Sequence, residues 1–250
     1  MFKTKEEALE YVKKDGGNLK YVPDEFKNDK DVVMEAINQD ISNLKYASGK
    51  LKKDKNFMFF IVKQDGWALT MAPEKFKNNK DYVLAAVKQN GWALGHASKR
   101  LQNDKEVVLE AVKQKGFSLG QASERLQDDK EVVLAAVKQN GNAILYVSEN
   151  LKDDKEVVLA AIEQDGEALK LSSCELRADK DILNAARNYL MCEKWVGSDT
   201  EQDFLFKAKE NLLKYDREDE LNKKLAELNK LQAQQNSNQA KVEVRIKRKL

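Results

Sequence analysis

Apolar residues recur along this chain with a helical period, and the whole pattern repeats every 25 residues. In one copy, Asp129 is followed by Val132, Val133, Ala136 and Val137, whose spacing of three or four residues predicts an apolar helix face. Each copy opens with a lysine, at Lys5, Lys30, Lys55, Lys80, Lys105, Lys130, Lys155 and Lys180. The pattern predicts about seven helical repeats, which we number from residue 4, and an incomplete further copy from residue 179.

Helix starts and ends are marked in the same way in every copy. The residue before the lysine is a helix N-cap type throughout: Thr4, Asp29, Asp54, Asn79, Asp104, Asp129, Asp154 and Asp179. A glycine stands where each long helix should end, at Gly16, Gly66, Gly91, Gly116, Gly141 and Gly166. We expect these glycines to close the helices with a positive φ. Because Ile41 takes this place in repeat 2, that helix should end less cleanly.

A shorter apolar pattern follows each glycine. In repeat 4 it consists of Ala93, Leu94, Ala97 and Leu101, with Ser98 marking the start of another short helical turn. Serine or proline occupies the matching place in the other copies, at Pro23, Ser48, Pro73, Ser123, Ser148 and Ser173. Each repeat is therefore predicted to hold a helix of about three turns and one or two shorter helical pieces.

Copies of this kind bury their apolar flanks only by stacking on one another. The terminal copies are accordingly more polar, since Glu7 replaces the usual valine in the first, and Asn184 and Arg187 replace leucine and valine in the last. We predict an all-α fold: a right-handed α-solenoid of about seven 25-residue helical repeats over residues 1–190, with a C-terminal helical cap.

Two runs of the sequence resemble a known family. Residues 104–116 and 129–141, together with the Gly-x-Ala-Leu-x-x-Ala-Ser pattern, are similar to the repeats of domain of unknown function 4116. The resemblance covers residues 4 to about 190, and the layout is similar to that of leucine-rich variant repeats. The family occurs in bacteria, including intracellular bacteria that inject effectors, and in some protists. The resemblance implies helical repeats and no particular activity.

The 25-residue period is lost after residue 190. Residues 198–201 read as a new helix start. An apolar stripe at Leu205, Ala208, Leu212 and Tyr215 is predicted to pack on the last repeat, within a capping region over residues 191–235. Further leucines fit a short coiled coil, at Leu221, Leu225, Leu228 and Leu231. Residues 236–250 are predicted to be a linker and basic tail, in which Val242, Val244 and Ile246 alternate as in a strand.

Charge and cysteine content narrow the class of protein. The net charge is +2, and the basic excess lies in residues 191–250, so the repeats have no general attraction for a phosphate backbone. The two cysteines, Cys174 and Cys192, have no metal-ligand spacing and suit a reducing compartment. We find no signal peptide and no segment long enough to span a membrane. We expect a cytoplasmic protein, or one translocated into a host cell without a classical signal.

Candidate catalytic groups are few. Stacked helices lie about 8–10 Å apart, so His96 in repeat 4 and Cys174 in repeat 7 should be separated by about 25–30 Å. That distance excludes a thiol–imidazole pair. No phosphate loop, dinucleotide fingerprint or zinc motif is present. We expect no enzymatic activity, no metal and no cofactor.

Two constant polar positions are expected to be structural. Glutamine recurs near the end of the long helix, at Gln39, Gln64, Gln89, Gln114, Gln139 and Gln164, and fits an amide ladder or a carbonyl cap. The repeated lysine lies near a helix start, where the helix dipole disfavours a cation. We expect a carboxylate of the preceding turn to compensate it, such as Asp128 near Lys130.

Two variable positions are the candidate binding site. The residue after the glycine is Trp92 in repeat 4 and Glu167 in repeat 7, and no core position accepts both. The site is predicted from this position and the one four residues later, and comprises Trp67, Met71, Trp92, His96, Phe117, Gln121 and Tyr146. Exposed aromatic residues of this kind are typical of partner sites. The alternative is that they fill gaps between short helices.

We therefore expect a non-enzymatic scaffold that binds a protein or peptide, with a role as a bacterial effector or adaptor. The partner and the oligomeric state stay unassigned. One alternative is binding of single-stranded nucleic acid by aromatic repeat positions, which the balanced charge of the repeats disfavours. A second alternative is an unrecognised enzyme, for which no paired acid, base or metal site stands out.

Overall fold

The computed structural model describes residues 2–173, 175–191 and 199–247, and side chains are described for all of these except 199–204 and 235–247. The described residues form helices and turns without a strand. They divide into two compact units, Met1–Ser173 and Cys174–Leu250, which we describe separately.

In the first unit, repeats 1 to 6 each contain a long α-helix, a 3-10 helix and a four-residue α-helix, and repeat 7 contains a long α-helix and a 3-10 helix. The long helices are α1 (Lys5–Lys14), α3 (Lys30–Gln39), α5 (Lys55–Gln64), α7 (Lys80–Gln89), α9 (Lys105–Gln114), α11 (Lys130–Gln139) and α13 (Lys155–Gln164). The 3-10 helices are η1 (Gly16–Tyr21), η2 (Ile41–Tyr46), η3 (Gly66–Met71), η4 (Gly91–His96), η5 (Gly116–Gln121), η6 (Gly141–Tyr146) and η7 (Gly166–Leu171). The short helices are α2 (Asp24–Lys27), α4 (Gly49–Lys52), α6 (Glu74–Lys77), α8 (Lys99–Gln102), α10 (Glu124–Gln127) and α12 (Glu149–Lys152).

The predicted N-caps are confirmed. Asp129, for example, accepts hydrogen bonds from the backbone N–H groups of Glu131 and Val132 through its Oδ1 atom. The side chain at the matching position of every other copy also caps its helix. Because the helices begin at the same place in each copy, the repeats stay in register.

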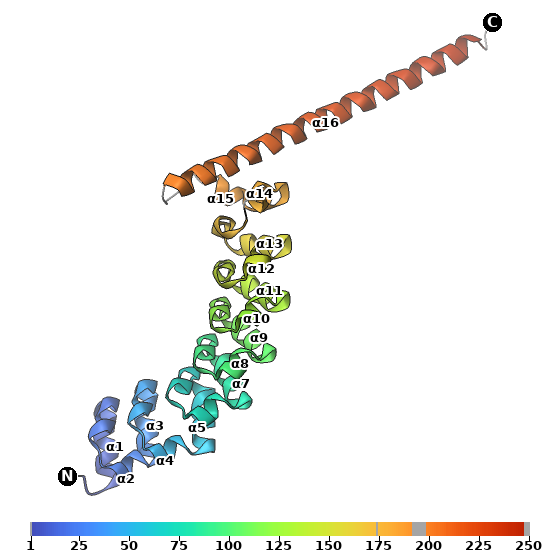
Figure 1. Ribbon diagram of the computed structural model, residues 1–250. Helices are drawn as coiled ribbons and strands as arrows, with labels where there is room; N and C mark the ends of the chain where they lie inside the picture. Colours follow the sequence, from blue (N-terminus) through green and yellow to red (C-terminus); the bar gives the residue numbers. More distant parts are fainter. Residues whose placement is uncertain (1, 174, 192–198, 248–250) are drawn as a thin grey trace. The chain divides into compact units, whose positions relative to one another are not determined.

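The repeats of the first unit follow one another in sequence order (Figure 1). Except between repeats 2 and 3, successive long helices of this unit pack side by side, and the 3-10 helices η1 and η3 to η6 each pack on the long helix of the next repeat. The core consists of small and branched apolar residues between these layers, and Val132, Val133, Ala136 and Val137 of α11 are fully or almost fully buried. The predicted stacking of repeated helical units is therefore present.

The glycines have a different role from the predicted one. None of the described residues has a positive φ, so no glycine ends a helix in the left-handed conformation. Instead, the next long helix comes too close for a side chain: a Cβ atom at Gly141 would lie 2.3 Å from the carbonyl oxygen of Ala161, and one at Gly66 would lie 2.3 Å from that of Ala86. Glycine is therefore needed for close packing between repeats.

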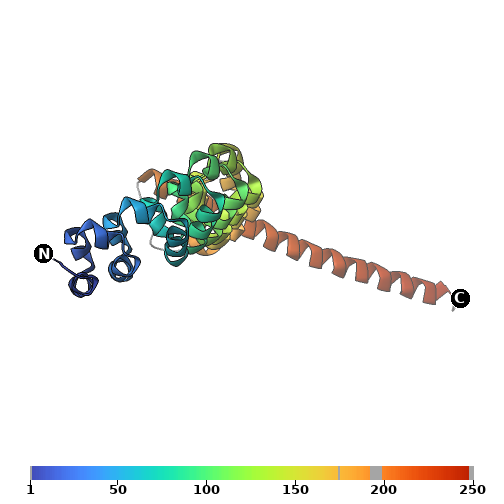
Figure 2. The same ribbon diagram turned by 90° about the horizontal axis from the view of Figure 1, so that it is seen from below.

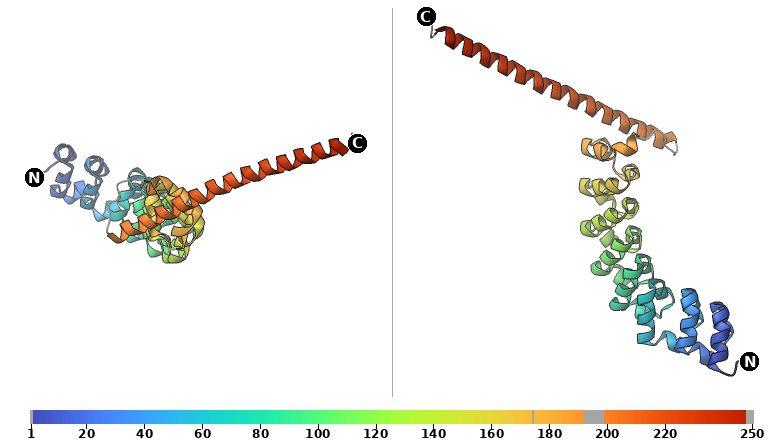
Figure 3. Two further views of the ribbon diagram at one scale, coloured as in Figure 1. Left: turned by 90° about the horizontal axis from the view of Figure 1, so that it is seen from above. Right: turned by 180° about the vertical axis from the view of Figure 1, so that it is seen from behind.

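Repeat 2 shows the consequence of losing this glycine. Helix α3 ends at Gln39 as the others do, so the expectation of a poorly ended helix at Ile41 is wrong. The difference lies at the next junction, where α3 barely contacts α5, although every other pair of successive long helices in this unit packs closely. Viewed along the row, the repeats of α1 and α3 stand to one side of the later ones (Figure 2), and both views of Figure 3 show the same offset.

The second unit contains η8 (Leu176–Ala178), α14 (Lys180–Ala185), α15 (Arg187–Leu190) and α16 (Asp199–Lys247). Helix α16 packs against α14 and α15, and the predicted stripe residues Leu205, Ala208 and Leu212 are buried there. The guanidinium group of Arg187 forms a two-pronged ion pair with Asp216 of α16. Since α14 and α15 pack with α16, the compact units divide after residue 173, whereas the loss of the period suggested residue 190.

The predicted linker and strand in residues 236–250 are wrong, because α16 continues through Lys247. No glycine or proline interrupts residues 198–247. The three β-branched residues Val242, Val244 and Ile246 cost a helix only a few tenths of a kcal/mol each, which is too little to break it. The leucines proposed for a coiled coil, Leu221, Leu225, Leu228 and Leu231, are all exposed on α16. The last three residues, 248–250, lie outside the described part.

Candidate functional site

The seven predicted site residues all lie on four successive 3-10 helices, η3 to η6. The backbone of these helices is fixed at its start by a polar side chain. Asp65 Oδ1 accepts from the N–H of Trp67 at 2.8 Å, and Asn90 Oδ1 accepts from the N–H of Trp92 at 3.1 Å. The capping residue itself has an extended backbone, so it turns the chain from the long helix into the 3-10 helix.

The large aromatic side chains of this site remain partly in solvent. Trp67 is 44% exposed, Trp92 39% and Tyr146 40%. Phe117, Met71 and His96 are half-buried, and Gln121 is exposed. The predicted half-exposure of the two variable positions is therefore present.

The aromatic rings touch from repeat to repeat. Trp67 meets His96 edge to face, with ring centroids 5.5 Å apart. Trp92 stacks on Phe117 at 6.4 Å, and Phe117 meets Tyr146 edge to face at 6.0 Å. We call Trp67, His96, Trp92, Phe117 and Tyr146 the aromatic row. Each ring thus has an aromatic neighbour in an adjacent repeat, which the gap-filling alternative also expects, while Trp67, Trp92 and Tyr146 remain 39–44% exposed.

Two of the predicted residues have other neighbours. Gln121 lies against Gly95, where a Cβ atom would be 3.1 Å from its Oε1 atom. Tyr146 lies against Gly120, where a Cβ atom would be only 2.7 Å from the ring. Met71 makes no ring contact and flanks the row on η3. Small residues thus leave room for the larger side chain of the next repeat.

His96 has the properties of a surface aromatic residue. Burial lowers the pKa of its imidazole, and the positive charge of Lys77 lowers that pKa further. The ring is therefore neutral at physiological pH and suited to its edge-to-face contact with Trp67. Cys174, the nucleophile considered for it, lies outside the described residues.

Neither a metal site nor a membrane span is found in the part of the chain that the structure describes. No group of three histidine, cysteine or acidic side chains is placed to hold a metal ion. None of the helices combines the length and the apolar character that crossing a bilayer requires.

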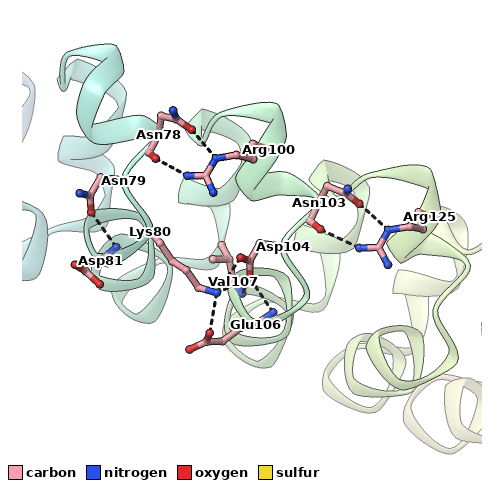
Figure 4. A network of polar contacts seen from close by, with 10 residues as sticks. All are labelled: Asn78, Asn79, Lys80, Asp81, Arg100, Asn103, Asp104, Glu106, Val107 and Arg125. Atoms are coloured by element: carbon pink, nitrogen blue, oxygen red, sulfur yellow. Dashed lines mark hydrogen bonds and ion pairs between the residues drawn. The ribbon is translucent and has the colours of Figure 1, made fainter.

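The repeated lysines form ion pairs between repeats, but with different partners from those predicted. Lys80 Nζ lies 2.8 Å from carboxylate oxygens of both Asp104 and Glu106 in the next repeat (Figure 4). Lys105 and Lys130 repeat this arrangement one and two copies later. The predicted partner of Lys130, Asp128, instead accepts a hydrogen bond from Ser148. The next N-cap carboxylate is closer because the helix starts of successive repeats lie side by side.

These ion pairs change the pKa values of the carboxylates. The hydrogen bond from Lys130 holds the pKa of Asp154 below its ordinary value of 3.8, although partial burial acts in the opposite direction. Each such Asp thus caps its own helix and binds the lysine of the preceding repeat. The series is interrupted at Lys55, because the next N-cap residue is Asn79, whereas Asp104, Asp129 and Asp154 follow Lys80, Lys105 and Lys130.

The repeated glutamine has the expected structural role at two junctions. Gln39 Oε1 accepts from the N–H of Gly16 at 2.8 Å, and its amide group donates to the carbonyl of Val12 at 3.1 Å. Gln139 makes the matching bond to the N–H of Gly116 at 2.5 Å. These bonds tie the end of one long helix to the next.

A cavity of about 350 Å³ lies at the open junction between repeats 2 and 3. Its apolar lining includes Ile37, Ile41, Phe60 and Ile61. Phe60 is 49% exposed. Ile41 and Ile61 occupy the positions that hold glycine and alanine at the neighbouring junctions, so their bulk keeps α3 and α5 apart.

The repeated units, their caps and their glycine contacts can be compared with known families. The model of the family described as Domain of unknown function (DUF4116) matches residues 4–52, 54–102, 83–127, 104–152, 129–177 and 154–186. The chain belongs to the DUF4116 family. Neither the search of curated proteins nor the search of solved structures found a match.

In this DUF4116 protein, the sequence analysis missed the residues that set the start of each 3-10 helix. They are Asp15, Asp40, Asp65, Asn90, Asn140 and Asp165, each bonded to the N–H two residues later. The sequence could have indicated this role, because Asp and Asn side chains commonly accept a hydrogen bond from the backbone two residues later in a turn. Lys115 is the exception, and its side chain makes no such bond.

Proposed function

We propose that this DUF4116 protein is a non-enzymatic scaffold that binds a protein or peptide through the aromatic row. We also propose that its 25-residue repeats, about seven in number, form a right-handed α-solenoid. The supporting observation is that Trp67 and Trp92 on the successive 3-10 helices η3 and η4, and Tyr146 on η6, expose large aromatic surfaces. Tryptophan and tyrosine contribute strongly to protein interfaces, because they bury a large apolar area at a small entropic cost.

The arrangement suits an extended partner. Aromatic residues of the row lie on four successive repeats, 3 to 6, and neighbouring repeats of a stacked array lie about 8–10 Å apart. A peptide strand advances about 3.3 Å per residue, so every third side chain can meet one aromatic position. A role as a bacterial effector or adaptor, acting in the cytoplasm or after translocation into a host cell, fits a scaffold of this kind.

The test is affinity capture from a cell lysate with the full chain and with the double variant Trp67→Ala/Trp92→Ala. We expect the variant to keep its helical circular dichroism spectrum and to lose the captured proteins. Phe60→Ala is a matched control, since Phe60 is also an exposed aromatic residue but belongs to α5 rather than to the row. Identical capture by both variants would contradict the proposal, as would unfolding of the double variant.

A further inference from the structure

A second set of side chains recurs once per repeat, at the second residue of the short helices. It comprises Lys50, Lys75, Arg100 and Arg125, which are all exposed. We call these four residues the basic row. They occupy equivalent positions in repeats 2 to 5, whereas repeats 1 and 6 have Glu25 and Asn150 there.

The contacts of the basic row hold its charges in place without neutralising them. Arg100 donates from Nε to Asn78 Oδ1 at 3.1 Å and from Nη2 to the carbonyl of Asn78 at 2.8 Å (Figure 4). Arg125 makes the same two bonds to Asn103. Lys75 donates to the carbonyl of Lys53 at 3.1 Å. Each of these acceptors is neutral and belongs to the preceding repeat, so Lys75, Arg100 and Arg125 are held in place but keep their charge.

The neighbouring lysines of the long helices show the opposite arrangement. Lys80 lies between two carboxylates in the same region, and its charge is therefore compensated. By contrast, no ion pair involves any member of the basic row among the described residues. A guanidinium group has five N–H donors, and Arg100 uses two of them on Asn78, so three remain to bind a ligand.

Further cations reinforce the row at its repeat 2 end. A cavity of about 470 Å³ there is lined by Lys30, Lys50, Lys53 and Lys55, and its one acidic residue, Asp54, is paired with Lys30 at 2.8 Å. Residues 45–80 contain nine lysines and three acidic residues. The balanced charge of the repeats as a whole thus conceals a local positive surface, which the sequence analysis did not recognise.

We infer that the basic row binds an acidic peptide segment of the partner, with carboxylates about three residues apart. This inference rests on the proposed scaffold function and names the chemistry of its partner. Stacked helices about 8–10 Å apart match the roughly 10 Å that three residues of an extended peptide span. Each strand of a DNA duplex carries a charge about every 3.4 Å of helix axis, so most of its phosphates would find no cation.

The test uses a fluorescent peptide of about 15 residues with glutamate at every third position. Its affinity is measured by fluorescence anisotropy at low and high salt. We expect binding to the full chain that weakens with salt, and a loss of about tenfold or more in the variant Lys75→Gln/Arg100→Gln/Arg125→Gln. The matched control Lys223→Gln/Lys224→Gln/Lys230→Gln removes the same charge from exposed positions of α16 and should change the affinity less than about twofold.

Two further arms separate charge from packing and identify the ligand. Arg100→Lys/Arg125→Lys keeps the charges and should keep the affinity within about threefold. A peptide with glutamine in place of glutamate should not bind. Failure of the glutamate peptide to bind, equal binding by the two glutamine variants, or binding of oligothymidylate that requires the row would overturn the inference. If the peptide fails while capture through the aromatic row persists, the inference fails and the proposed function stands.

Discussion

Phe60 and Trp92 are both exposed aromatic residues, but they lie at junctions of opposite kinds. Around Trp92, the junction is closed: a Cβ atom at Gly91 would lie 2.4 Å from the carbonyl oxygen of Ala111, and α7 packs along α9. Around Phe60, the junction is open, and a cavity separates α3 from α5. Phe60 is exposed because packing is lost beside it, whereas Trp92 is exposed on a fully packed array. The cause of exposure of an apolar residue in a repeat protein therefore depends on whether the junction beside it is closed or open.

The open junction lacks a backbone hydrogen bond that the closed ones have. At the closed junctions, the N–H of Ser98 donates to the carbonyl of Lys77 at 2.9 Å, and that of Ser123 donates to Gln102 at 3.0 Å. Pro73 stands at this position in repeat 3 and has no N–H to donate. Three changes in sequence thus act together at the open junction: Ile41, Ile61 and Pro73.

The largest expected effect is closure of the open junction. The variant Ile41→Gly/Phe60→Ala/Ile61→Ala gives it the small residues found between α9 and α11. The spin labels are placed at residues 38 and 63 after Cys174 and Cys192 are replaced by serine. The distance between these labels should fall in the variant to the distance between labels at the equivalent exposed positions 113 and 138. Electron paramagnetic resonance measures both distances. An unchanged separation between 38 and 63 would show that bulk at these positions does not hold the junction open.

The closed junctions should tolerate no added atom at the glycine. Gly141→Ala is expected to lower the free energy of unfolding by about 1–3 kcal/mol, because the new Cβ overlaps the carbonyl oxygen of Ala161. The control is Gly49→Ala on α4, where a Cβ atom meets nothing within 4 Å. That substitution should be neutral or stabilise by up to about 1 kcal/mol. Urea unfolding measures both, and a similar loss in both variants would be evidence against the close-contact role.

Acid should weaken the closed junctions through their aspartates. The pKa of Asp154 is lowered in the folded state, chiefly by its hydrogen bond from Lys130, so its contribution to stability is present above the ordinary value of 3.8. That contribution is lost as the pH falls below 3.8 through the lowered pKa. We expect Asp154→Asn to reduce the fall in melting temperature between neutral and acidic pH. A variant with the same pH dependence as the native protein would contradict this role.

The smallest effect is expected from restoring the missing ion pair beside the open junction. Asn79→Asp places a carboxylate next to Lys55 and keeps the N-cap bonds to Asp81 and Tyr82. Because the pair is near the surface, it should stabilise the fold by about 0.2–1 kcal/mol, and less at high salt. Thermal unfolding at two salt concentrations checks this, and Lys55→Gln in the Asn79→Asp background should remove the gain.

Much of the fold followed from the sequence, because each repeat carries its own local signals. The Asp and Ser caps and the apolar face of α11 predict the helices, and their 25-residue period predicts stacking. The role of the glycines could not be predicted in this way. The residues next to Gly141 in sequence suggest a helix end, whereas the residue that requires a glycine there, Ala161, lies in the next repeat. The partner of Lys130 was missed for the same reason.

The candidate site was predicted in part. Variation between Trp92 and Glu167 indicated half-exposure without any structure. The pairing of Trp92 with Phe117, and the fixing of Arg100 on Asn78, depend on how one repeat faces the next. The helical end of α16 was missed because alternation at Val242–Ile246 was given more weight than the lack of any helix-breaking residue.

The proposed function depends most directly on the exposure of Trp67 and Trp92 in the folded protein. Acrylamide quenching of tryptophan fluorescence measures it, in a variant with Trp195→Phe so that only these two residues emit. The account predicts red-shifted emission and efficient quenching by acrylamide while the helical circular dichroism signal is intact. Blue-shifted emission that resists quenching would place both rings in the core and contradict their role as a binding surface.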